Sequence, residues 1–261
     1  MDLVERLGPQ ALPSLCLLNE TFVQMRIHYS LIGATALLVH HIDLPRITQD
    51  LDVVVAIRGS FTDTLDELVT RGFRRTKTAH RVVSPQGTKV DILPVSSKGA
   101  KTGVIEWPDG TTMTAVGLKE ALDLAVHVLL ADCEIRVAPV PILAGLKLIA
   151  STSTQRRGKD DLNDLLECLE QYALQGERRF SVYDLTDREL TFDQAGAFLL
   201  GHELKTAVQP ATLRAVRAAL SATLKSPLPS RRLKTQDRVE ELLRSFQGAL
   251  NPNRSGEKEP I

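Results

Sequence analysis

A strand that begins with two acidic residues is the feature that most constrains this chain. Asp50-Leu51-Asp52 runs directly into the apolar, mostly β-branched residues 53–57, which predicts a β-strand over 51–57. Side chains two positions apart on a strand point to the same face, so Asp50 and Asp52 set two carboxylates side by side. Such a pair repels unless a cation lies between the carboxylates, and oxygen ligands of this kind suit Mg²⁺. The segment therefore predicts either a divalent-metal site or a solvated pair of acids at the start of a strand.

Gly33 interrupts an apolar segment upstream of these acids. We expect a strand over 27–32, a turn at Gly33 and a helix over 34–41. Glycine lets a backbone come close to a ligand, and a helix that begins just after it offers free N–H groups to a phosphate. Thr35 adds a hydroxyl at the same place, so the segment predicts a phosphate contact.

Asp91 lies in the middle of a second short apolar strand, predicted over 88–93. A buried carboxylate without a partner is costly, so an acid between Val90 and Ile92 needs a physical reason. Asp91 is therefore either an exposed residue on an edge strand or a third carboxylate that joins Asp50 and Asp52 and activates a nucleophile.

Hydrophobic periodicity and turn residues divide the chain into a mixed N-terminal part and a helical C-terminal part. The expected strands are 27–32, 51–57, 73–83, 88–93, 102–107, 111–115 and 135–137, and the expected helices are 10–28, 34–41, 61–71, 118–131, 141–151, 160–173, 191–200, 210–224 and 235–250. We expect an α+β fold, with a small mixed sheet and flanking helices over residues 1–116, a mainly helical domain over 117–250 and a disordered tail over 251–261.

Composition narrows the classes of function. The formal net charge is zero and aromatic residues make up 4%, which argues against a strongly basic nucleic-acid-coating surface and against base-stacking platforms, and there is no DNA-specific motif. Three widely separated cysteines favour a reducing compartment, and no apolar run approaches the ~20 residues of a membrane span. We expect a cytoplasmic protein that does not enter a membrane.

Taken in order, these segments resemble the nucleotidyltransferase fold of the DNA polymerase β superfamily. The resemblance is carried by Gly33-Ala34-Thr35, by Asp50-x-Asp52 and by the strand-borne Asp91. Residues 32–37, followed by residues 46–52, make the chain most similar to the AbiEii-like branch of abortive-infection and toxin nucleotidyltransferases. A second block agrees with this branch and consists of residues 135–139, 146–150 and 157–165, with a weaker echo at 195–201. Together the matches span residues 29–201.

The resemblance implies a set of roles for these residues. Asp50, Asp52 and Asp91 would be the catalytic acids and the ligands of two Mg²⁺ ions, with an NTP as substrate. The implied nucleotide-binding residues are Gly33, Ala34, Thr35, Arg46, Thr48, Lys147, Asp161 and Asp164. The family commonly has Gly or Ser where this chain has Ala34, so a hydroxyl contact to phosphate would fall to Thr35.

Several of these residues have plainer interpretations. Lys147 lies in an apolar helix, from which its side chain either reaches the surface along its aliphatic stem or contacts the triphosphate. Asp161 and Asp164 are three residues apart on one helical face. There they hold Lys147 or Arg157, help a base or acceptor bind, or are simply acids favoured near a helix N-terminus. Arg46 is either a ligand of phosphate or acceptor, or an ordinary surface residue.

Three functions remain open on the sequence. The first is a toxin or defence nucleotidyltransferase that acts on RNA, especially a tRNA 3′ end, or on protein, with an antitoxin protein as a partner. The second is the same chemistry on a small molecule such as an antibiotic, which the neutral charge suits slightly better. The third is a non-catalytic regulatory module that keeps the fold, against which the retention of all three acids argues.

Overall fold

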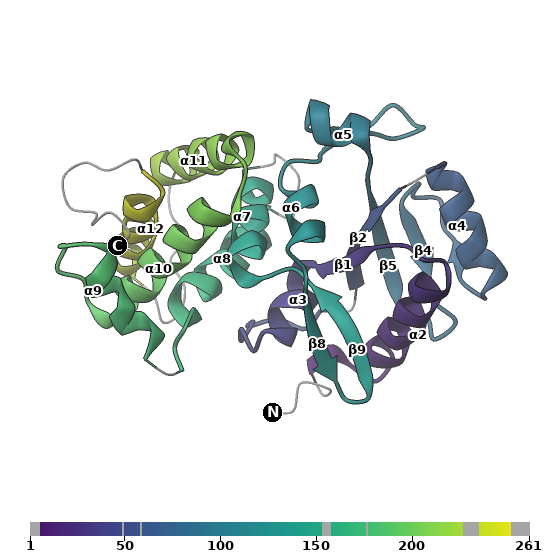
Figure 1. The fold of residues 1–261 in the computed structure, drawn as a ribbon, viewed down its shortest axis with the longest axis horizontal. Helices are drawn as coiled ribbons and strands as arrows, with labels where there is room; N and C mark the ends of the chain where they lie inside the picture. The colour runs from purple at the N-terminus through teal and green to yellow at the C-terminus, as the bar shows by residue number, and fades with distance from the viewer. Residues whose placement is uncertain are drawn as a thin grey trace. The chain divides into compact units, whose positions relative to one another are not determined.

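Three consecutive valines, residues 53–55, lie at the centre of a mixed sheet in strand β2 (Asp50–Ala56), and none of them has exposed surface. The computed structural model describes residues 6–48, 50–57, 59–152, 158–175, 177–226 and 235–251. The chain forms two compact units, Met1–Pro139 and Val140–Ile261 (Figure 1).

The first unit is built on a sheet whose strands run in both directions. The strands beside β2 are β1 (Tyr29–Ile32), β3 (Arg74–Arg75), β4 (Arg81–Val83), β5 (Lys89–Val95), β8 (Val126–Leu130) and β9 (Cys133–Val137). Over the described residues these form a seven-stranded sheet in the order β3-β4-β5-β2-β1-β9-β8. β2 is antiparallel to β1 and parallel to β5, so β2 and β5 start at the same end of the sheet.

Helices cover the central strands. α2 (Ala11–Gln24) contacts β2 and β9, while α3 (Gly33–Val39) and α6 (Leu118–Asp123) each contact β1 and β2. α2 contributes Leu15, Leu18 and Phe22 to the core, and all three are fully buried. The unit also contains α4 (Phe61–Thr70), α5 (Ser97–Thr102) and a separate hairpin of β6 (Val104–Glu106) and β7 (Thr112–Thr114).

The second unit is helical in the residues that the structure describes. Its elements are α7 (Val140–Ser151), α8 (Gly158–Gln171), η1 (Arg178–Ser181), α9 (Val182–Leu185), α10 (Phe192–Ala207), α11 (Pro210–Lys225) and α12 (Gln236–Leu250). α10 contacts α7, α8 and α12 (Figure 1). It starts at a capping box, in which the Thr191 hydroxyl accepts from the backbone N–H of Gln194 and the Gln194 side chain accepts in return.

The predicted α+β fold with a mixed sheet and flanking helices is confirmed, and so is the strand predicted at 135–137, which is β9. The predicted helix over 118–131 is wrong in its second half, because α6 ends at Asp123 and the chain then forms β8, antiparallel to β9. The sheet therefore continues past residue 116. The boundary between the two units falls between residues 139 and 140 of the sequence, instead of between the predicted 116 and 117. α5 and the turns of helix at 178–185 were not predicted.

Two further predictions concern membrane spans and the end of the chain. Among the described residues, no helix has the length and apolar character needed to cross a membrane. The tail predicted at 251–261 lies outside the described residues apart from Asn251.

Candidate active site

The three predicted acids lie on one face of the sheet, at the start of two neighbouring strands. In the parallel pairing of β2 with β5, Asp52 is the register partner of Asp91 and Asp50 is the partner of Lys89. Partners on adjacent strands are separated by about 4.8 Å and point the same way, and Asp50 shares the face of Asp52 because it is two residues away. The structure thus brings together the carboxylates that the sequence separates by about 40 positions.

Asp91 is buried and paired with an arginine. It is 7% exposed and lies on a strand with neighbours on both sides, so the interpretation of Asp91 as an exposed edge-strand residue is wrong. Arg81 is its register partner on β4, and its Nε and Nη2 donate to the two carboxylate oxygens at 2.6 and 2.7 Å. These hydrogen bonds, with the charges of Asp91, Asp50 and Asp52, raise the pKa of Arg81 above its usual value despite partial burial.

Arg81 is the residue that sequence reasoning missed, although a signal for it was present. The turn predicted at 84–87 closes with the backbone N–H of Ser84 donating to Thr88 O at 2.9 Å. A hairpin's register is set by its turn, so counting back from this turn puts Arg81 opposite Asp91.

Gly33 is positioned against Asp52 itself. Ile32 is the register partner of Asp52, and the chain turns at Gly33 with φ +74°. A Cβ atom at Gly33 would lie 2.9 Å from Cγ of Asp52 and closer still to Oδ2. The close approach predicted at Gly33 is therefore made by a carboxylate of the chain, and only glycine leaves room for it in this backbone conformation.

The other nucleotide-binding candidates of this unit surround the same strand. Thr35 is buried, and its hydroxyl donates to the backbone oxygen of Asp50 at 3.1 Å, which ties α3 to the start of β2. Ala34 is buried beside it. Arg46 is half-buried and Thr48 is buried in the loop between α3 and β2. Their roles toward a nucleotide stay predictions.

The chemistry of the acids fits a divalent ion in part. Asp50, Asp52 and Asp91 offer the hard oxygen atoms that Mg²⁺ takes, and all three act electrostatically on one cationic group, the Arg81 guanidinium. However, no group of three or more His, Cys, Asp or Glu within the described residues is arranged to hold a metal ion, and both oxygens of Asp91 accept from Arg81. In this structure Asp91 holds the guanidinium, and ion binding by the carboxylates of Asp50 and Asp52 stays a prediction.

The second unit contains its own buried ionic cluster. Lys147 Nζ lies 2.7 Å from Asp161 Oδ1 and 2.9 Å from Asp164 Oδ2, with Lys147 9% exposed and the Asp164 side chain fully buried. Burial alone would lower the pKa of Lys147, but the two carboxylates raise it above its usual value. The interpretation of Lys147 as a surface-reaching lysine is therefore wrong, and Asp161 and Asp164 hold it as one alternative predicted; Arg157 lies outside the described residues.

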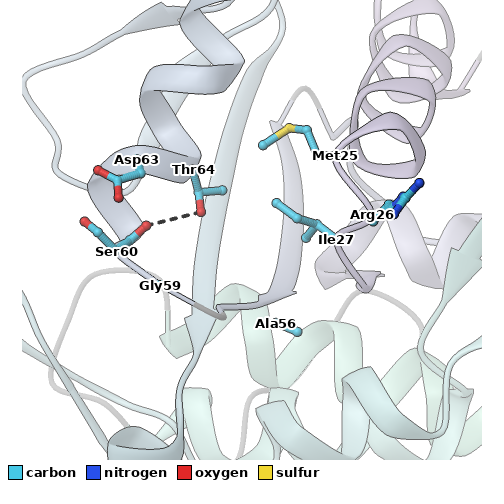
Figure 2. Close-up of a pocket in the computed structure, with 8 residues that line it drawn as sticks. All are labelled: Met25, Arg26, Ile27, Ala56, Gly59, Ser60, Asp63 and Thr64. Atoms are coloured by element: carbon cyan, nitrogen blue, oxygen red, sulfur yellow. Dashed lines mark hydrogen bonds between the residues drawn. The ribbon is translucent and has the colours of Figure 1, made fainter.

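A surface pocket of about 330 Å³ lies at the opposite end of β2 from the acids. It is lined by Met25, Arg26, Ile27, Ala56, Gly59, Ser60, Asp63 and Thr64. Figure 2 shows Ser60, Asp63 and Thr64 from the start of α4 on one side, with Met25 and Ile27 across from them. Ala56 lies six positions beyond Asp50 and four beyond Asp52 along the strand, about 20 and 13 Å, so this pocket is not part of the acidic site.

The chain is similar to one protein family and to solved structures. A family model described as "Nucleotidyl transferase AbiEii toxin, Type IV TA system" matches residues 17–252. Among solved structures, the chain is similar to an antigenic nucleotidyltransferase-like protein from Paracoccidioides brasiliensis, with 17% identity, 83% of this chain and 92% of that chain covered, and a TM-score of 0.41. It is also similar to the lincosamide antibiotic adenylyltransferase LnuA in its lincomycin-bound form, with 15% identity, 59% and 94% coverage and a TM-score of 0.40. No curated protein matches the chain.

Proposed function

The chain belongs to the AbiEii family of nucleotidyl transferases, and on this premise we propose that it moves an NMP group from an NTP onto a hydroxyl in a Mg²⁺-dependent reaction. The observation that supports the metal dependence is the meeting of Asp50, Asp52 and Asp91 on one face of the sheet. We propose RNA, and a tRNA 3′ end in particular, as the acceptor class, with protein as the other macromolecular acceptor.

Asp50 and Asp52 would hold the ion, with Asp91 as the third acid of the site. A divalent ion bound there would supply Lewis-acid stabilisation of phosphate oxygens and would lower the pKa of the attacking hydroxyl. The chain's own residues fix the positions of the acids. Gly33 leaves room for the Asp52 carboxylate, Thr35 ties the backbone of Asp50 to α3, and Arg81 holds Asp91.

Nucleotide contacts are proposed for a further set of residues. The backbone N–H groups at Gly33 and Ala34 are next to the acids and would face the phosphates, and Arg46 and Thr48 precede β2 on the adjoining loop. The buried hydroxyl of Thr35 is used by the backbone of Asp50, which favours a supporting role for it. A role for Lys147, Asp161 and Asp164 toward the nucleotide follows from the family resemblance and stays a prediction.

The experiment is a labelling assay with a charge-matched control. Wild-type protein, Asp52→Asn and Asp132→Asn are incubated with Mg²⁺, each α-³²P-labelled NTP in turn, and total RNA. Asp132 is an exposed acid in the β8–β9 turn, so its substitution removes the same charge away from the site. We expect label on RNA with wild type and Asp132→Asn and a loss of at least 100-fold with Asp52→Asn, because each metal ligand contributes affinity and orientation. Wild-type-like transfer by Asp52→Asn would refute the proposed site.

A small-molecule acceptor is the second candidate, favoured by the zero net charge, since an RNA-binding surface is commonly basic. Mg²⁺-dependent NTP binding without label on RNA or protein would move the acceptor to this class, and no NTP binding would leave the non-catalytic module. Membership of a toxin–antitoxin family also supports a toxin role in the cytoplasm with an antitoxin protein as partner. Growth arrest on expression of wild type but not of Asp52→Asn tests that role.

A further inference from the structure

Arg81 is the cation around which the acids of the site are arranged. Its two hydrogen bonds use both oxygens of Asp91, and the charges of Asp50 and Asp52 act on the same guanidinium. The pairing is built into the sheet, because Arg81 and Asp91 are register partners on the antiparallel strands β4 and β5. A bidentate guanidinium–carboxylate pair has little freedom to admit a second cation, and two cations at one carboxylate repel each other.

We propose that Arg81 is an internal competitor of the divalent ion: it holds Asp91 in the metal-free protein, and Asp91 becomes a metal ligand only when Arg81 releases it. This inference rests on the proposed function and names Arg81 as a positioning residue of that site. Arg81 thereby prevents a buried carboxylate from being left unpaired, and it sets the metal concentration at which the site fills.

The burial of the two partners indicates which of them moves. The side chain of Arg81 is 22% exposed, whereas that of Asp91 is 10% exposed. Arg81 comes from a three-residue strand with only the two-residue strand β3 beyond it, whereas Asp91 lies within a seven-residue strand next to β2. The guanidinium can therefore turn toward solvent on its flexible stem while the carboxylate stays in place.

The test is a double-mutant cycle that reads metal binding in the absence of nucleotide. Mn²⁺ affinity of the full-length chain is measured by electron paramagnetic resonance for wild type, Arg81→Gln, Asp91→Asn and the double variant. We expect Arg81→Gln to bind Mn²⁺ at least tenfold more tightly than wild type, and we expect most of this gain to vanish in the Asp91→Asn background. If Arg81 acted only through its long-range charge, the gain would persist without Asp91.

Two further variants complete the design. Arg75→Gln removes the same charge from an exposed pair with Asp66 on the same unit and should leave Mn²⁺ affinity unchanged. Arg81→Lys keeps the charge but not the bidentate contact, so we expect it to tighten Mn²⁺ binding by less than Arg81→Gln; it also serves if Arg81→Gln fails to fold.

The outcomes separate this inference from the function on which it rests. Mn²⁺ binding by wild type, lost in Asp52→Asn but unchanged or weakened in Arg81→Gln and Arg81→Lys, would overturn the competition while leaving the metal site in place. No Mn²⁺ binding by wild type or by either Arg81 variant would refute the metal site itself, and the competition with it.

Discussion

Replacing Gly33 by alanine tests whether the backbone is shaped to seat Asp52. Two separate effects act at this position. The backbone of Gly33 is at φ +74°, a conformation that costs a residue with a side chain about 1–2 kcal/mol of folding free energy. In addition, the new methyl group would lie 2.9 Å from Cγ of Asp52, so the carboxylate has to move.

The magnitude can be divided between these effects with a matched variant. Forcing an extra methyl group into an occupied position typically costs about 1–3 kcal/mol. Together with the backbone effect, we expect Gly33→Ala to lower the free energy of unfolding by about 2–5 kcal/mol. Gly8 has almost the same conformation, φ +77°, but a Cβ atom there would meet nothing within 4 Å. Gly8→Ala should therefore lose only about 1–2 kcal/mol, and the difference between the variants measures the clash with Asp52.

The chain offers a direct readout of the unit that carries both glycines. Its single tryptophan is Trp107, which lies in the first unit, so urea unfolding followed by tryptophan fluorescence reports on that unit. Mn²⁺ binding is measured in parallel, and we expect Gly33→Ala to lose it while Gly8→Ala keeps it. Equal destabilisation of the two variants, with Mn²⁺ binding intact in Gly33→Ala, would refute the idea that Gly33 is there for Asp52.

Two other predictions concern buried polar groups. Lys147→Met leaves the carboxylates of Asp161 and Asp164 without their cation. We therefore expect the free energy of unfolding of the second unit to fall by about 3–5 kcal/mol, measured by thermal unfolding followed by circular dichroism. A fall below about 1 kcal/mol would contradict a buried, paired lysine. Burial raises the pKa of Tyr29, whose hydroxyl donates to Asn19, to about 12 from 10.0. Because the pKa of Tyr29 is higher in the folded state than in the unfolded state, its ionisation should not affect the stability of the first unit below about pH 10. As the pH rises toward 12, the free energy of unfolding should fall by about 2–3 kcal/mol. Urea unfolding midpoints that fall equally with pH in Tyr29→Phe would contradict this prediction.

Strand periodicity in the sequence was enough to group two of the three acids, but not to arrange the strands of the sheet. The rule that residues two apart share a face was enough to pair Asp50 with Asp52. The register of Asp52 against Asp91 was beyond that rule, because β2 and β5 are joined through α4, β3 and β4 and meet only in the folded sheet. The local sequence pattern indicates which residues form a strand and which of them share a face, whereas long-range packing decides which strand pairs with it in parallel.

The wrong helix at 118–131 has a local physical cause. Leu130 pairs with Cys133, so β8 and β9 are joined by a tight turn at Ala131 and Asp132. Such a turn requires positive φ and usually carries Gly or Asn, but here Ala131 adopts φ +53°. Without a turn residue to interrupt it, the apolar segment reads as a continuous helix.

Two features that restrict the choice of residue meet at the same point of the sheet. Gly33 adopts a left-handed backbone conformation beside the Asp52 carboxylate, and Arg81 and Asp91 form a largely buried ion pair where apolar residues of similar volume would be neutral or stabilising. The opposite face of β2 is filled by fully buried aliphatic side chains, so packing on that face explains neither feature. Buried charges, and close approaches that only glycine permits, persist at functional sites because a ligand makes use of them. The decisive measurements at Gly33 and Arg81 are therefore of metal binding, since stability alone would not distinguish a site from a poorly packed sheet.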